Sequence, residues 1–105
     1  MSTLPKPPAA YSDFIGRYPD LGKAWELIGQ AGGDGPLDAK TVRLIKLGIA
    51  IGAMREGAVH SSVRKALATG IDPSELEQVT ALAAGTMGLP STVAVFTWVR
   101  EALDR

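Results

Sequence analysis

The chain has 105 residues, of which 46% are hydrophobic and 21% are charged. These proportions are typical of one soluble globular domain and not of a disordered segment. Eleven basic residues balance eleven acidic ones, so the chain has no broad positive field that would attract nucleic acid or an anionic membrane. Because cysteine is absent, disulfides, thiol nucleophiles, iron–sulfur clusters and thiolate zinc sites are excluded.

The size and the N-terminal sequence lead to expectations about assembly and location. A domain of this length buries only about two thirds of the surface that its unfolded chain exposes, so association between copies would add stability. The N-terminus has no basic segment followed by an apolar run, and no window of about 18 apolar residues is free of charge. We therefore expect a cytoplasmic homo-oligomer with no nucleic-acid or membrane partner.

The N-terminal third is predicted to hold an arm and two helices. The first ten residues contain three prolines, which fix φ and remove amide donors: Pro5, Pro7 and Pro8. Residues 1–10 are accordingly predicted to be an extended arm, and residues 11–105 a single helical domain. Tyr18 precedes a proline and should interrupt the first helix. A second helix is predicted over residues 19–30, with its apolar positions at helical spacing: Leu21, Trp25 and Ile28.

Asp38 is predicted to cap a long helix that runs to about residue 54, because its carboxylate can accept from the amides of the first turn. The apolar positions of this helix recur every three or four residues, as in one buried stripe: Leu44, Leu47, Ile51 and Met54. Gly48 and Gly52 lie four residues apart, and each costs up to about 1 kcal/mol relative to alanine. We expect the close approach of another helix to compensate for that cost.

Three more helices are predicted in the C-terminal half. The first begins near Arg55 and ends at Gly70, with Val59, Val63, Ala66 and Leu67 on one face. Asp72-Pro73-Ser74-Glu75 resembles a capping box and starts the next, which should carry five residues inward: Leu76, Val79, Leu82, Ala83 and Met87. The last runs over residues 90–103 and should bury Val93, Phe96, Val99 and Leu103. Since no stretch alternates like a strand, the predicted fold class is all-α.

His60 is the only histidine, and it follows Glu56 by four residues, a spacing that brings the two side chains together on a helix. One interpretation is a site for proton transfer. The other is a packing or interface histidine with a structural partner. Two ligands are fewer than the three or four of a stable metal site, so the sequence assigns neither a metal nor any other cofactor.

The order of these signals resembles the carboxymuconolactone decarboxylase and alkylhydroperoxidase D-like family, over roughly residues 37–103. The matching segments are Leu37-Asp38, Arg43-Leu44-Ile45-Lys46-Leu47, Glu56-Gly57-Ala58-Val59-His60-Ser61, Arg64-Lys65-Ala66-Leu67 with Gly70, and then Glu75, Val79, Gly88 and Pro90. The resemblance implies a compact helical domain of the alkylhydroperoxidase D-like type that assembles as a trimer or a hexamer.

The redox branch of that family uses a glutamate, two cysteines and a histidine. By resemblance, those positions fall here on Arg43, Arg55, Ala58 and Ser62. Since none of the four required residues is present, no thiolate is available to attack a peroxide or a disulfide. We therefore expect no disulfide peroxidase chemistry.

The decarboxylase-like branch needs no cysteine and often carries two histidines separated by one residue, which fall here on His60 and Ser62. The resemblance implies an enzyme for a small carboxylated or carbonyl compound, with His60 and Glu56 as its catalytic residues. Arg43, Arg55 and Ser62 would then bind the substrate, because decarboxylation needs a clamp for the carboxylate and a proton donor for the carbon. The alternative is a catalytically silent scaffold or ligand-binding module of the same fold.

Overall fold

The computed structural model describes residues 9–105, and every regular element among them is a helix, which confirms the all-α prediction. These residues form two compact units, residues 9–37 and residues 38–105, and each is described by itself. Most of the predicted arm lies outside the described residues. Its last two residues, Ala9 and Ala10, already belong to the first helix, so the helix begins earlier than the sequence indicated.

The N-terminal unit is a pair of helices, α1 (Ala9–Arg17) and α2 (Pro19–Gly33). Tyr18 separates them with φ −129° and ψ 72°, outside helical geometry, as expected for a residue before proline. Gly22 is the one buried residue of this unit, and a Cβ there would lie 3.3 Å from Ile15 Cβ. The two helices thus meet at a glycine. Their predicted apolar stripe is more than half exposed: Leu21, Trp25 and Ile28.

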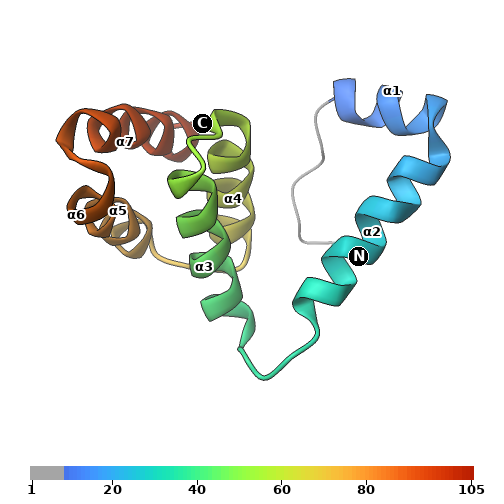
Figure 1. Cartoon of the computed structure of the whole chain (residues 1–105), viewed down its shortest axis with the longest axis horizontal. Helices are drawn as coiled ribbons and strands as arrows, with labels where there is room; N and C mark the ends of the chain where they lie inside the picture. The colour runs from blue at the N-terminus through green and yellow to red at the C-terminus, as the bar shows by residue number, and fades with distance from the viewer. Residues whose placement is uncertain (1–8) are drawn as a thin grey trace. The chain divides into compact units, whose positions relative to one another are not determined.

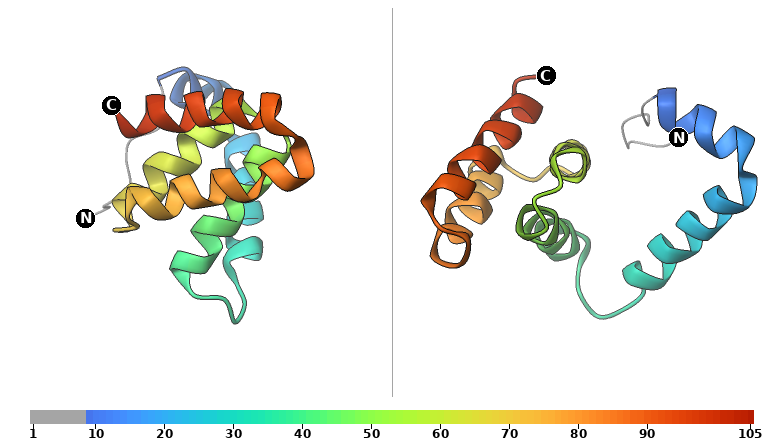
Figure 2. Two further views of the ribbon diagram at one scale, coloured as in Figure 1. Left: turned by 90° about the vertical axis from the view of Figure 1, so that its left-hand side faces the viewer. Right: turned by 45° about the horizontal axis from the view of Figure 1, so that its top comes forward.

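The C-terminal unit contains α3 (Ala39–Gly52), α4 (Glu56–Ala68), α5 (Pro73–Leu82), α6 (Ala84–Met87) and α7 (Leu89–Leu103). Its four longer helices form a four-helix bundle in which each helix packs against two others. The contacting pairs are α3 with α4, α4 with α7, α7 with α5, and α5 with α3 (Figures 1 and 2). The side chains enclosed by them form the core: Leu47, Ala50, Ile51, Val59, Val63, Ala66, Ile71, Leu76, Val95, Val99 and Ala102.

The predicted boundaries of α3 and α4 are close to those observed. The Asp38 carboxylate accepts a hydrogen bond of 2.7 Å from the amide of Thr41, so the predicted cap is present. The helix stops at Gly52, two residues early, and the chain then turns through Met54 at φ 54°. Gly70 adopts φ 91° after α4, a conformation that favours glycine. The close approach expected at the two glycines is absent, because a Cβ at Gly48 would meet Val79 at an ordinary contact distance of 3.9 Å and a Cβ at Gly52 would meet no described neighbour within 4 Å.

The start of α5 is a complete capping box, as predicted. The Asp72 carboxylate accepts from the Ser74 amide at 2.8 Å, and the Glu75 carboxylate accepts from the Asp72 amide at 3.2 Å. Lys40, in the first turn of α3, forms an ion pair of 2.6 Å with Glu75. This ion pair links the starts of α3 and α5.

The capping box predicts how stability depends on pH. Hydrogen bonds from Ser74 lower the pKa of Asp72 below its usual value of 3.8. The folded chain therefore binds this proton less readily than the unfolded chain, and the stabilisation is present above the unfolded pKa and is lost as pH falls through the folded one. Asp72→Asn retains a capping oxygen that does not titrate. In urea titrations we expect the variant to be less stable than the wild type at pH 7, because it lacks the ionised carboxylate, and the difference to narrow toward pH 3 as Asp72 is protonated; parallel losses would contradict the assignment.

Two predictions about the last helices are wrong. The predicted continuous helix to Met87 is interrupted at Ala83, where α5 ends and the single turn of α6 follows, and Leu82 is 71% exposed. On α7, Val93 and Phe96 are exposed. The buried face of α7 is Thr92, Val95, Val99 and Ala102, so the prediction holds for Val99, and Leu103 packs half-buried against the core. This stripe is rotated from the predicted one because it must face α4 and α5 together.

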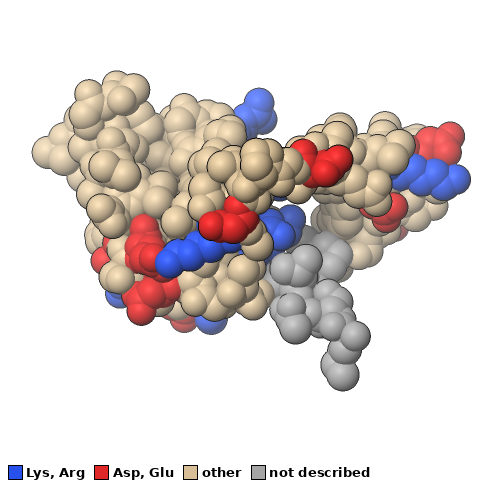
Figure 3. All heavy atoms as spheres, turned by 90° about the horizontal axis from the view of Figure 1, so that it is seen from below, with Lys and Arg blue, Asp and Glu red and all other residues tan. Residues whose placement is uncertain are grey.

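The surface agrees with the balanced composition. Acidic and basic side chains lie interspersed on the face shown in Figure 3. Among residues 9–105, no helix is long and apolar enough to span a bilayer.

Candidate functional site

The candidate site lies where α4 packs against α7, and local backbone geometry places its first residues. Arg55 precedes α4 in an extended conformation, with φ −102° and ψ 97°. The helix then begins at Glu56, so that His60 stands one turn further along the same helix. His60 is 9% exposed. The His60 imidazole therefore lies buried at the edge of the hydrophobic core.

A third residue joins this pair from the last helix. His60 Nε2 lies 3.3 Å from Glu101 Oε2, and one ligand atom from each of Glu56, His60 and Glu101 falls within 4.8 Å of the others. His60 Nε2 is buried, yet it makes no hydrogen bond to any described residue. The contact with Glu101 is thus close without being aligned as a hydrogen bond.

The two carboxylates lie on the solvent side of the imidazole. The Glu101 side chain is 45% exposed, whereas the His60 side chain is 11% exposed, and Glu56 is also exposed. An imidazole nitrogen next to carboxylates can hold a proton or a cation. His60 Nε2 therefore has no hydrogen-bond partner among the described residues, and the exposed carboxylates of Glu56 and Glu101 lie near the imidazole.

The other predicted site residues do not belong to this group of three. Arg55 is exposed at the start of α4, and Ser62 is half-buried on α4. Arg43 is half-buried on α3, where it is one of several cations near Lys65. None of Arg43, Arg55 and Ser62 contributes to the Glu56, His60 and Glu101 cluster.

Arg43 belongs to a second group, which we call the cationic cluster: Arg43, Lys46, Arg64 and Lys65. Burial lowers the pKa of Lys65, and repulsion from the other three cations lowers it further. No member forms an ion pair with an acidic group of residues 9–105. From the sequence, Arg43 is predicted to bind a substrate carboxylate. In the structure Arg43 lies in a group with three other cationic side chains.

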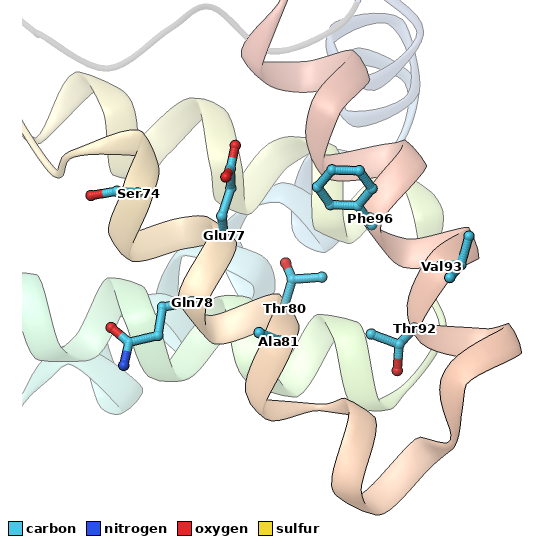
Figure 4. Close-up of a pocket in the computed structure, with 8 residues that line it drawn as sticks. All are labelled: Ser74, Glu77, Gln78, Thr80, Ala81, Thr92, Val93 and Phe96. Atoms are coloured by element: carbon cyan, nitrogen blue, oxygen red, sulfur yellow. The ribbon is translucent and has the colours of Figure 1, made fainter.

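Two cavities lie elsewhere in the C-terminal unit. One, of about 460 Å³, is lined by residues of α5 and α7, among them Thr80, Thr92 and Phe96 (Figure 4). The other, of about 330 Å³, is lined by Gly48, Gly52 and residues of α5 and α6. None of the five predicted site residues lines either cavity.

Glu101 is the residue that sequence reasoning missed. It lies on α7, far from His60 along the chain, and no local motif marks it. Only the packing of α4 against α7 brings its carboxylate to the imidazole. The sequence alone carries no signal for Glu101, because its place beside His60 depends on which face of α7 packs against α4.

Comparisons with known proteins agree with this all-α fold. The family model described as the carboxymuconolactone decarboxylase family matches residues 19–101, most of the chain. Neither the curated proteins nor the solved structures gave a match.

Proposed function

The chain belongs to the carboxymuconolactone decarboxylase family, and we propose on that premise that it acts on a small carboxylated or carbonyl compound. In this proposal His60 donates and accepts the proton, and Glu56 and Glu101 adjust its position. The assembly is a cytoplasmic homo-oligomer, a trimer or a hexamer as the family resemblance implies. Disulfide peroxidase chemistry has no part, because the chain has no cysteine.

The observation that carries the proposal is the buried His60 Nε2 that lacks a hydrogen-bond partner among the described residues. In a decarboxylation the C–C bond to the carboxylate breaks, carbon dioxide leaves, and the electron pair of that bond remains on the substrate carbon. That carbon then takes a proton, which His60 Nε2 would supply as general acid. The exposed Glu101 side chain would swing aside to admit the substrate.

The substrate carboxylate would be held by the cationic cluster. Arg64 follows His60 by four residues on α4, so the two side chains emerge from the same side of the helix. Arg43 reaches the same cluster from α3. A small acid bound there would be oriented with its reacting carbon toward the imidazole, which is the positional contribution that catalysis requires. Arg55, which precedes α4, and Ser62 on α4 are the further substrate-binding residues that the family resemblance assigns.

The alternative function is a silent oligomeric scaffold or ligand-binding module. The observation that favours it is the number of large apolar side chains that are at least 44% exposed in the C-terminal unit. They include Ile45 and Ile49 on α3 and Val93 and Phe96 on α7. Exposed apolar side chains mark association sites in folded proteins where they form a contiguous patch.

The experiment is a turnover panel of lactone acids and β-keto acids, with release of carbon dioxide as the readout. The proteins are wild type, His60→Ala and Asp104→Asn, the last removing an exposed carboxylate just after α7 and outside the cluster. We expect turnover by wild type and by Asp104→Asn, and little by His60→Ala. Equal turnover by all three would remove His60 from the mechanism. No turnover by any, together with a stable oligomer in sedimentation, would favour the scaffold.

A further inference from the structure

We propose that Glu56, His60 and Glu101 form a binding site for one divalent first-row transition-metal ion, with Zn²⁺ as the most suitable probe. The ligands would be His60 Nε2 and one oxygen from each glutamate. This inference goes beyond the proposed function and does not depend on it, because binding of a metal is measurable without any substrate.

The distances suit a metal after small side-chain movements. Metal bonds to nitrogen and oxygen of about 2.0–2.2 Å place two ligands of one ion about 3.0–3.6 Å apart. His60 Nε2 and Glu101 Oε2 are already 3.3 Å apart. The full set spans up to 4.8 Å, and the side chains that must turn inward are the exposed glutamates, not the buried imidazole.

A separate observation points to a ligand, namely the state of the imidazole nitrogen. His60 is 9% exposed, and its Nε2 is shielded from solvent without a hydrogen bond to any described residue. A buried polar atom that lacks a partner is uncommon in folded proteins and calls for an explanation such as an ion. Here the atom lies 3.3 Å from a Glu101 carboxylate oxygen, and the Glu56 carboxylate belongs to the same group of three residues; carboxylates commonly bind metal ions.

The ligand types indicate the class of metal. One imidazole nitrogen and two carboxylate oxygens suit Zn²⁺, Mn²⁺, Fe²⁺, Co²⁺ or Ni²⁺, whereas Mg²⁺ and Ca²⁺ prefer oxygen alone. Three protein ligands leave at least one coordination position for water or a substrate atom. Because both glutamates are exposed, that position would open toward solvent.

The same Nε2 would serve a proton in the proposed reaction and a metal in this inference, so the two occupants exclude each other. Zn²⁺ is therefore expected to inhibit any turnover that depends on the His60 proton. The sequence analysis assigned no metal because Glu56 and His60 supply only two ligands. Glu101 raises the number available to three.

The test is titration of the chelator-treated full chain with Zn²⁺ by calorimetry, and with Co²⁺ by visible absorption. We expect one ion per chain in wild type, binding at least about tenfold weaker in Glu101→Gln, and no site-specific Co²⁺ spectrum in His60→Ala. Asp104→Asn is the matched control and should bind as wild type does. Circular dichroism checks the fold of each variant, and Glu101→Gln, an exposed change, keeps the test valid if His60→Ala does not fold.

Several results would overturn the metal site. These are the absence of stoichiometric Zn²⁺ binding in wild type, an equal loss in Asp104→Asn and Glu101→Gln, or Mg²⁺ binding as tight as Zn²⁺. The two proposals fail separately. Zn²⁺ binding in a protein without turnover leaves the metal site standing, whereas turnover in a protein that does not bind Zn²⁺ removes the metal site alone.

Discussion

Replacing Leu76 with alanine is expected to lower the free energy of unfolding by about 2–5 kcal/mol, because the change removes three carbons from a filled core and leaves a cavity. Leu76 is fully buried on α5 and lies among the side chains shared by the four long helices. Urea unfolding followed by circular dichroism measures the change, and the slope of the transition should stay constant if the folded state is otherwise intact.

Leu82→Ala is the matched control, since it makes the same chemical change on the same helix. Leu82 is 71% exposed, and a surface change of this kind usually alters stability by no more than about 0.5 kcal/mol. The sequence pattern predicted that both leucines are buried, whereas only Leu76 is buried in the structure. Comparing the two variants therefore tests the structure against the sequence pattern. Equal destabilisation by the two variants would mean that Leu82 is buried after all, and that α5 is longer than described.

The proposed chemistry predicts that His60→Ala and Arg43→Ala affect different kinetic constants. Loss of a general acid lowers kcat, by about 10²–10⁴-fold, so we expect His60→Ala to act mainly on kcat. Arg43 would hold the substrate carboxylate mainly in the ground state, because that group loses its charge as carbon dioxide leaves, so loss of the contact raises KM without lowering kcat. Steady-state kinetics on the best substrate of the turnover panel measures both constants.

Lys23→Ala, which removes a cation from α2 outside the cationic cluster, serves as the charge control and should leave both constants near those of the wild type. A large fall in kcat for Arg43→Ala would place its charge at the reacting centre. An unchanged KM in the same variant would take Arg43 out of substrate binding.

Helix starts were predictable from the sequence because they depend on residues within one turn of each other. Asp38 and the Asp72 capping box are examples, since each cap is made with an amide two or three residues away. The buried stripe of α4 was predictable for a similar reason: its periodicity is regular, and Val59, Val63 and Ala66 are all fully buried. Local chemistry was sufficient for these features.

Two of the wrong burial predictions concern α7, a helix that packs against two others, α4 and α5. On α7, apolar residues occur around most of the circumference, so periodicity did not distinguish the exposed Val93 and Phe96 from the buried Val95, although it placed Val99 correctly. Which of them is buried depends on contacts with α4 and α5. For the candidate site, the spacing of Glu56 and His60 could be read locally, whereas Glu101 depends on that same tertiary packing.

The early end of α5 has a consequence for the candidate site. After Leu82 the chain reverses through α6, and α7 returns alongside α5, so that Arg100 near its end pairs with Glu77 at 3.2 Å (Figure 2). Each residue added to a helix advances it by about 1.5 Å. If α5 continued to Met87, the reversal would come more than a turn later, and Glu101 would slide past the imidazole. The length of one short helix thus sets the register in which carboxylate and histidine meet.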